Sequence, residues 1–350
     1  MSIVNFESTN FPTSSALNGI LTKHVDVVDL IWSCVSYGKY DLPGMFAYSG
    51  YSYAEILSRI FKLCSALSVG SLGYHQSPLY LSADETERSD LTYFIGMTTC
   101  KQYALCRHNV AWLFHTSWRG VYGHTITKAF HTRSEPDFIG RTKQGDWIVA
   151  EAKGTTKQPT AQLLAKAKSQ ANLVVAVDNV PPILTFGTVT YFAPEMALIA
   201  DDPEVGDDGI RFVTNEDELL GAYYGFASLL KGVASNDKEL KVGNSRVKFT
   251  IFELSGLGLS IGLPSNFLYD ISWEKLFDFA SNFEDGAHTI SYINDDLTNG
   301  QFVNGGDSIV EDMSRVVSRS KVYLDGVYVS IDSRWSNFDL PISVSQEHAL

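Results

Sequence analysis

The chain has 350 residues, of which 45% are hydrophobic and 19% are charged. This composition is typical of a soluble globular protein of two or three domains and excludes a disordered or fibrous one. Charge-free stretches such as residues 254–266 contain Gly, Ser and Pro, and they are shorter than the roughly 20 apolar residues of a membrane helix. Residues 1–11 have no basic patch before an apolar core, so we expect a cytoplasmic protein with no secretory signal and no membrane partner.

The chain contains four cysteines, Cys34, Cys64, Cys100 and Cys106. They are too few and too irregularly spaced for a disulfide framework, or for a zinc site built from paired CxxC halves. We therefore expect buried free thiols.

The net charge of −13 argues at first against a nucleic-acid partner, because such binding depends on Lys and Arg that neutralise phosphates. The charge is uneven, however. Residues 91–170 contain eleven Lys and Arg against four Asp and Glu, a local charge of +7, and the other 270 residues have a charge of −20. This asymmetry is typical of a polyanion site in an otherwise acidic protein. A solvated basic face explains the same pattern.

Residues 1–89 are expected to form a mainly helical N-terminal region. Apolar residues recur at helical spacing over residues 26–37 and 54–69, which predicts two helices. Leu42-Pro43-Gly44 and the residues after it indicate a turn and a loop between them.

Residues 90–200 are expected to form an α/β core. Apolar spacing predicts a long helix over residues 91–118, ended by Gly120. The period then changes to that of strands over residues 123–132, 137–140 and 146–152. Pro159 opens a further helix, because proline at the first helical position loses no hydrogen bond, and residues 184–192 return as a strand. The order of helix, three strands, helix and strand predicts a sheet with mixed parallel and antiparallel pairing.

Residues 201–350 are expected to form an α/β C-terminal region of unknown role. Helices are predicted over residues 216–231, 273–283 and 307–318, and a strand over residues 247–254. Asp325-Gly326 predicts a hairpin between residues 321–324 and 327–331. We recognise no catalytic constellation in this part of the sequence.

Pro136-Asp137 and Glu151-Ala152-Lys153 are the residues that indicate chemistry. Alternate side chains of a strand share a face, so Glu151 and Lys153 project together, and Asp137 joins them if its strand pairs alongside. Two carboxylates and a main-chain carbonyl form a hard oxygen site suited to Mg²⁺, which keeps several waters and binds few protein ligands beside a substrate phosphate. Such a metal polarises a phosphoryl oxygen and activates a water, which Lys153 would position or help to deprotonate.

These motifs resemble the PD-(D/E)xK, or restriction-endonuclease-like, nuclease superfamily. The similarity covers residues 91 to about 194, with both motifs on predicted strands followed by a helix and a further strand. It implies a mixed central sheet flanked by helices. It also implies that Asp137, Glu151 and the carbonyl of Ala152 bind Mg²⁺ or Mn²⁺, and that Lys153 assists the attacking water. The implied activity is the hydrolysis of phosphodiester bonds, in DNA rather than RNA, for example in restriction or in defence against phage.

The sequence departs from the family in its first core helix. Many members have a further Glu there, whereas residues 91–120 contain no acid. RecB-like and CRISPR-adaptation nucleases have a metal-binding His instead, and His108 or His115 is similar to it, although packing or surface exposure explains either histidine. The RecB-like motif also has a Tyr four residues after its helix Gln, where Gln170 is followed by Val174. No cysteine follows the catalytic motif, which argues against an iron–sulfur cluster.

The helix after the motif has a row of polar residues that could contact nucleic acid. Gln162, Lys166 and Gln170 are spaced at i, i+4 and i+8, and this row, together with Lys168, could follow the phosphates of a bound strand. Gln170 could also contact the metal site.

Two other interpretations of the motif stay open. Its charged residues could form a salt-bridged strand edge in an unrelated α/β domain. Alternatively, the protein could be a nucleic-acid- or protein-binding subunit that has the nuclease fold but a catalytically silent site. Contacts with a second copy or with a partner subunit are expected to use the N- or C-terminal region.

Overall fold

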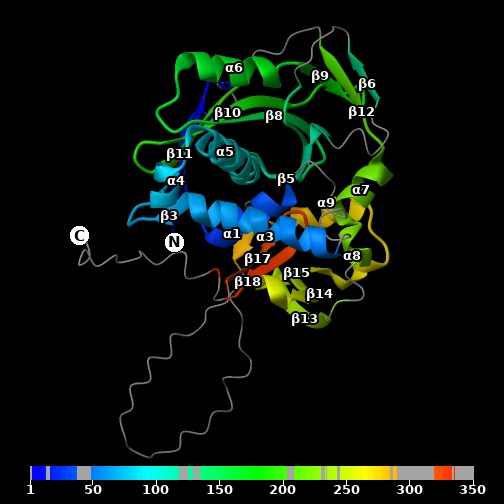
Figure 1. Ribbon diagram of the computed structural model, residues 1–350. Coiled ribbons are helices and arrows are strands. Elements are labelled where there is room, and N and C mark those ends of the chain that lie inside the picture. Colours follow the sequence, from blue (N-terminus) through cyan, green and yellow to red (C-terminus); the bar gives the residue numbers. More distant parts are fainter. Residues whose placement is uncertain are drawn as a thin grey trace, which may run out of the picture.

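The computed structural model describes residues 2–12, 16–37, 49–117, 125–128, 135–202, 209–229, 233, 235–242, 245–283, 287–289, 319–332 and 335. These residues form two large β-sheets of seven and six strands, two smaller sheets, and the helices that surround them (Figure 1). The predicted mixed α/β class is therefore confirmed. In this part of the chain, no helix combines the length and the apolar character needed to span a bilayer.

The larger sheet has the strand order β2-β1-β11-β10-β8-β7-β5. Its strands are β1 (Ser2–Thr9), β2 (Gly19–Val25), β5 (Val110–His115), β7 (Phe138–Thr142), β8 (Trp147–Gly154), β10 (Leu184–Phe192) and β11 (Met196–Asp201). β10 is parallel to β8 and β1 is parallel to β11, whereas the other neighbours are antiparallel. Residues 2–25 thus join the same sheet as residues 110–201, across the boundary predicted near residue 89.

Two helices cover opposite faces of this sheet, α5 (Glu85–His108) on one side and α6 (Ala161–Ala171) on the other (Figure 1). Glycines allow both to approach closely. A Cβ at Gly187 of β10 would lie 2.5 Å from the backbone of Ala167 in α6, and one at Gly154 of β8 would lie 2.1 Å from the carbonyl oxygen of Thr92 in α5. Neither strand position has room for a side chain.

The helix predicted over residues 91–118 begins and ends earlier than expected. Asp84 is its N-cap, because its carboxylate accepts hydrogen bonds from the backbone N–H groups of Thr86 and Glu87, so the helix begins at Glu85. Asn109, with a φ of 52°, ends it in the left-handed conformation. Val110–His115 forms β5 instead, since a short apolar run buried on both faces has the same sequence pattern in a helix and in a strand.

The smaller sheets lie beside these elements. One has the order β6-β12-β9 and comprises β6 (Thr125–Lys128), β12 (Ile210–Val213) and β9 (Val174–Val177); the other pairs β3 (Leu67–Val69) with β4 (Tyr74–Gln76). The described part of the strand predicted over residues 123–132 is β6, which pairs with β12 and not with the larger sheet. The first core strand is therefore β5.

The six-stranded sheet is antiparallel throughout, with the order β13-β14-β15-β18-β17-β16. Its strands are β13 (Ser235–Val242), β14 (Ser245–Leu254), β15 (Leu259–Pro264), β16 (Ala287–Thr289), β17 (Arg319–Tyr323) and β18 (Tyr328–Ile331). The strand predicted over residues 247–254 and the Asp325-Gly326 hairpin are confirmed, with Gly326 at a φ of 76°.

The helices of the C-terminal region agree with the sequence where the structure describes them. Those predicted over residues 216–231 and 273–283 are α7 (Glu216–Tyr224) with α8 (Phe226–Leu229), and α9 (Trp273–Ser281). Short 3₁₀ turns occur at Ser255–Leu257 and Ser265–Leu268. The helix predicted over residues 307–318 lies outside the described residues.

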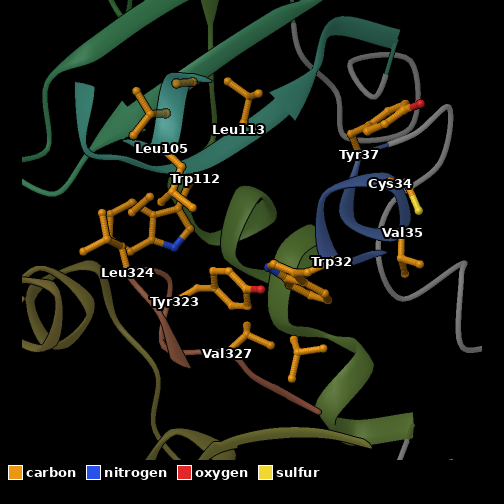
Figure 2. Packing of buried hydrophobic residues seen from close by; sticks show 14 of the residues in the cluster. Trp32, Cys34, Val35, Tyr37, Leu105, Trp112, Leu113, Tyr323, Leu324 and Val327 are labelled. Atoms are coloured by element: carbon orange, nitrogen blue, oxygen red, sulfur yellow. The ribbon is translucent and has the colours of Figure 1, made fainter. Parts of the chain in front are cut away.

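Helix α1 (Val27–Ser36) connects the two large sheets, with α5 on one side and β17 and β18 on the other. The helix α3 (Ser49–Ala66) lies beside it, and α4 (Pro78–Ser82) packs against α3 and α5. Figure 2 shows Trp32 of α1 next to Tyr323 of β17, with ring centroids 6.3 Å apart. Lys321 Nζ also lies 2.9 Å from a carboxylate oxygen of Asp26 and 2.5 Å from one of Asp29. A continuous apolar core therefore joins the two sheets.

We predict that Gly187→Ala lowers the free energy of unfolding by about 1–3 kcal/mol, because the new Cβ meets backbone atoms of α6 that cannot give way unless the helix moves. Gly221→Ala is the matched control. A Cβ at this position of α7 meets no described atom within 4 Å, so the change should be neutral or stabilising by about 0.5–1 kcal/mol. Chemical denaturation measures both, and equal stability of the two variants would contradict the close packing of α6 on β10.

Candidate functional site

Asp137 and Glu151 lie side by side at one end of the larger sheet. Phe138, the first residue of β7, pairs with Ala150 of the antiparallel strand β8. Asp137, one residue earlier, therefore lies opposite Glu151. The backbone N–H of Asp137 donates to Glu151 Oε2 at 2.9 Å, and the backbone N–H of Ala152 donates to Asp137 Oδ2 at 3.0 Å. These reciprocal hydrogen bonds hold the two carboxylates together.

Lys153 completes the cluster on the face that strand alternation predicts. Its Nζ forms an ion pair with Glu151 Oε1, and the side chains are 22% exposed for Lys153 and 1% exposed for Glu151. Glu151 pairs with Gly187 of β10. α6 packs against Gly187 on the side where a Cβ would point. The three charged groups of this carboxylate cluster, Asp137, Glu151 and Lys153, are thus brought together, with Glu151 buried and the other two half-buried.

Burial makes the ionised carboxylates of this cluster unfavourable. The pKa of Glu151 is raised to about 8, first by burial and second by the charge of Asp137, against the attraction of Lys153. Burial also raises the pKa of Asp137, against its hydrogen bond from Ala152 and the charge of Lys153. With both carboxyls ionised, the single ammonium leaves one negative charge in excess, which a divalent cation would neutralise.

The donor atoms of the cluster suit a hard cation. Carboxylate oxygens favour Mg²⁺ or Mn²⁺ over the softer metals that prefer thiolate ligands. Across the described ranges, no three or more His, Cys, Asp or Glu side chains are grouped closely enough to hold a metal ion. A cation beside Asp137 and Glu151 would therefore have two protein carboxylates and take its other ligands from water, a main-chain carbonyl such as that of Ala152, or a substrate, as Mg²⁺ commonly does.

His108 is remote from the cluster. It is the last residue of α5, and its ring stacks on Phe11 and Phe186 with centroids 5.6 and 5.1 Å apart. Burial lowers its pKa to about 3. α5 contacts the backbone of Lys153 at Gly96. His108 lies twelve residues after Gly96, which places it about 18 Å further along the helix axis. His108 is therefore an aromatic packing residue, and the expectation that it binds the metal is not supported.

His115 does not share a helix face with His108, because it belongs to β5. It pairs with Phe138, against which its ring packs edge-on with centroids 5.6 Å apart, and its Nδ1 accepts a hydrogen bond from the backbone N–H of Ser117 at 3.1 Å. Since paired residues share a face and Phe138 points opposite to Asp137, His115 lies on the face away from the carboxylates. This position does not support the expected metal role.

The polar row of α6 is only partly available to a ligand. Gln162 and Lys166 are exposed, whereas Gln170 is half-buried in the last turn of the helix. Lys168 lies on a different side from Lys166 and forms an ion pair with Asp201 of β11 at 3.2 Å. The nucleic-acid contacts of Lys166 and Lys168, and the metal-site contact of Gln170, stay predictions, and Lys168 is already paired with an acid.

Within the described part of residues 91–170, the basic side chains do not all lie on one exposed face. Lys101 is 5% exposed. Arg141 lies 4.8 Å from the ring centroid of Trp147 and pairs with Glu216. Part of the local charge of +7 therefore stabilises the fold, while Lys157 and Lys166 are exposed to solvent.

Comparison with known proteins assigns no family to the chain. No family model, no curated protein and no solved structure matches it. The functional interpretation therefore depends on the geometry of the site.

The first turns of α5 contain residues that the sequence did not single out. Glu85, Arg88 and Tyr93 of its first turns line a cavity together with Lys153 and Lys157. The helix before β5 also has acids in its first turns, so the expectation that it contains none is wrong. An Asp followed by Glu residues, before a long helical pattern, was the available signal for this N-terminus.

We predict that Glu151→Gln stabilises the metal-free protein at high pH. A carboxyl whose pKa rises on folding from 4.5 to about 8 costs stability as the pH increases through that window, because the folded state then binds more protons than the unfolded state. Melting temperatures in EDTA should nearly coincide at pH 5. At pH 8.5 the variant should melt at least about 2 °C higher, the shift that roughly 1 kcal/mol produces. A variant that melts lower at pH 8.5 would contradict the raised pKa.

Proposed function

We propose that this protein is a metal-dependent nuclease of the PD-(D/E)xK type, which hydrolyses phosphodiester bonds, with DNA as the favoured substrate. The proposal depends on one observation above all. Asp137, Glu151 and Lys153 meet at one end of two paired strands, in a cluster that has one negative charge in excess when ionised. This arrangement suits a divalent cation beside a phosphate group.

The order and pairing of the elements support the same proposal. Among the elements of the larger sheet and its two covering helices, α5, β5, β7, β8, α6 and β10 occur in the order helix, three strands, helix and strand, while β6 and β9, which come between them in the chain, belong to a smaller sheet. β7 is antiparallel to both of its neighbours, β5 and β8, and β10 lies parallel to β8. The two helices flank opposite faces (Figure 1). This arrangement is similar to the restriction-endonuclease-like core, to which β1, β2 and β11 add three strands.

The position of β8 argues against a simple salt-bridged strand edge. β8 lies between β7 and β10, not at an edge of the sheet, and Glu151 is almost fully buried. Removing an ion pair from water commonly costs more than the attraction returns. Titratable groups in such costly positions are typical of functional sites.

Each residue of the cluster has a role in this proposal. Asp137 and Glu151 would hold Mg²⁺ or Mn²⁺ through their carboxylates, together with the carbonyl of Ala152. When bound, the cation supplies Lewis-acid polarisation of a phosphoryl oxygen. Lys153, whose side chain is 22% exposed, would hold the attacking water and offset the negative charge that develops on the phosphate.

We predict that the purified protein nicks or degrades plasmid DNA with Mg²⁺ or Mn²⁺ and not with EDTA. Asp137→Ala, Glu151→Ala and Lys153→Ala should each lower the cleavage rate by roughly 10²–10³ or more, because the three residues act as one unit. Agarose electrophoresis of supercoiled plasmid measures the rates.

Asp146→Ala is the matched control, since this exposed acid lies at the opposite end of the β7–β8 hairpin, and it should cut at the wild-type rate. Wild-type rates in all three cluster variants would show that the site is assigned wrongly. Binding of DNA without cleavage in either metal would indicate the silent binding subunit instead.

A further inference from the structure

A cavity of about 600 Å³ opens next to Lys153, between the first turns of α5 and the residues that follow β8. Its charged and aromatic lining residues are Glu85, Arg88, Tyr93, Lys153 and Lys157. Lys153 thus belongs both to the carboxylate cluster and to the cavity. A chain bound at the carboxylates would meet this cavity as it leaves them.

The size of the cavity limits which ligands it can hold. Its volume is within the range of about 300–1,000 Å³ that is typical of sites for small molecules. One or two nucleotides with unpaired bases fit such a space. A double helix, whose major groove alone is about 12 Å wide, is too large to enter it.

Arg88 and Lys157 provide positive charge on the cavity wall. One terminal nitrogen of Arg88 donates to the carbonyl oxygen of Ala83 at 2.9 Å, which holds the guanidinium at the cavity wall. The planar fork of N–H donors in a guanidinium is suited to phosphate oxygens. Lys157 is exposed. Glu85 is the one acid in this lining, against three cations.

Tyr93 provides an aromatic surface in the same cavity. Its side chain is 47% exposed, which leaves part of the ring available for stacking. Burial first, and then the negative charges of Asp137 and Glu151, raise its pKa to about 12. The hydroxyl therefore lies within electrostatic reach of both carboxylates and is neutral at physiological pH. A neutral aromatic ring between cations is the usual platform for an unpaired base.

We infer that this cavity binds a single polynucleotide strand beside the scissile phosphate, with a base stacked on Tyr93 and neighbouring phosphates in contact with Arg88 and Lys157. The inference rests on the proposed nuclease function and narrows its substrate. The protein would act on single strands, overhangs or flaps in preference to an intact duplex.

Fluorescence anisotropy in EDTA separates binding from cleavage. The probes are a labelled single strand of about 12 nucleotides, within the usual site size, and a blunt duplex of the same length. The wild-type protein should bind the single strand more tightly than the duplex. Tyr93→Leu should weaken this binding at least about fivefold, which is the lower end of a lost stacking contact. Tyr93→Phe keeps the ring and should retain the affinity.

The phosphate contacts of Arg88 and Lys157 are tested by the salt dependence of single-strand binding. Arg88→Gln and Lys157→Gln should each flatten the slope of log K against log salt by about 0.7, the value for one phosphate contact on a single strand. Arg246→Gln is the control, because this exposed arginine pairs with Glu239 on the six-stranded sheet, and its slope should not change. Glu85→Gln removes the acid of the wall and should not lower the affinity.

The two proposals fail in different ways. Equal binding by Tyr93→Leu and the wild type, unchanged slopes in both cation variants, or tighter binding of the duplex would overturn the inference even if plasmid is cut. Binding of the single strand through these residues, without cleavage in Mg²⁺ or Mn²⁺, would support the cavity assignment and overturn the nuclease. Circular dichroism melting confirms that each variant is folded before its affinity is compared.

Discussion

The register between β7 and β8 is the constraint on which the site depends. The hairpin that joins them closes through Gly145, which has a φ of 90°, and through a hydrogen bond from the backbone N–H of Thr142 to the carbonyl oxygen of Asp146. A slip of one residue would move every side chain of one strand to the other face. Asp137 and Glu151 would then lie on opposite sides of the sheet, and no cation could contact both.

The surrounding structure keeps this costly cluster in place. β10 covers the other side of β8, and the hydroxyl of Thr188 donates to the carbonyl oxygen of Glu151 at 3.0 Å. Gly96 and Gly154 bring α5 against the end of β8, and Gly187 brings α6 against β10. Burying two carboxylates beside one ammonium destabilises the fold, so the apolar core that extends to the six-stranded sheet offsets that cost.

The cluster and the cavity depend on each other through α5. Its N-cap, Asp84, determines that the helix begins early enough for Glu85 and Arg88 to line the cavity beside Lys153. A start at residue 91 would leave both residues out of the helix. The same helix contacts α1, which packs on β17 and β18. The six-stranded sheet therefore supports the helix that lines the proposed strand-binding cavity, although it adds no residue to the carboxylate cluster.

The sequence by itself determined the features that depend on near neighbours. Alternation predicted that Glu151 and Lys153 share a face, and Asp325-Gly326 closed a real hairpin. The helix predicted from Pro159 is present, but Thr160 is its N-cap and it begins at Ala161, so Pro159 is not its first residue. Each of these signals acts within a few residues, so no distant contact is needed to interpret it.

Only the tertiary structure decided the rest. Whether Val110–His115 continued the helix or formed an edge strand depended on its pairing with β7. β1 joined β11 across about 190 residues of sequence, Lys168 found Asp201, and His108 was enclosed by aromatic rings. Pairings between segments far apart in the chain follow from which apolar faces must be buried together, and local spacing does not contain that information.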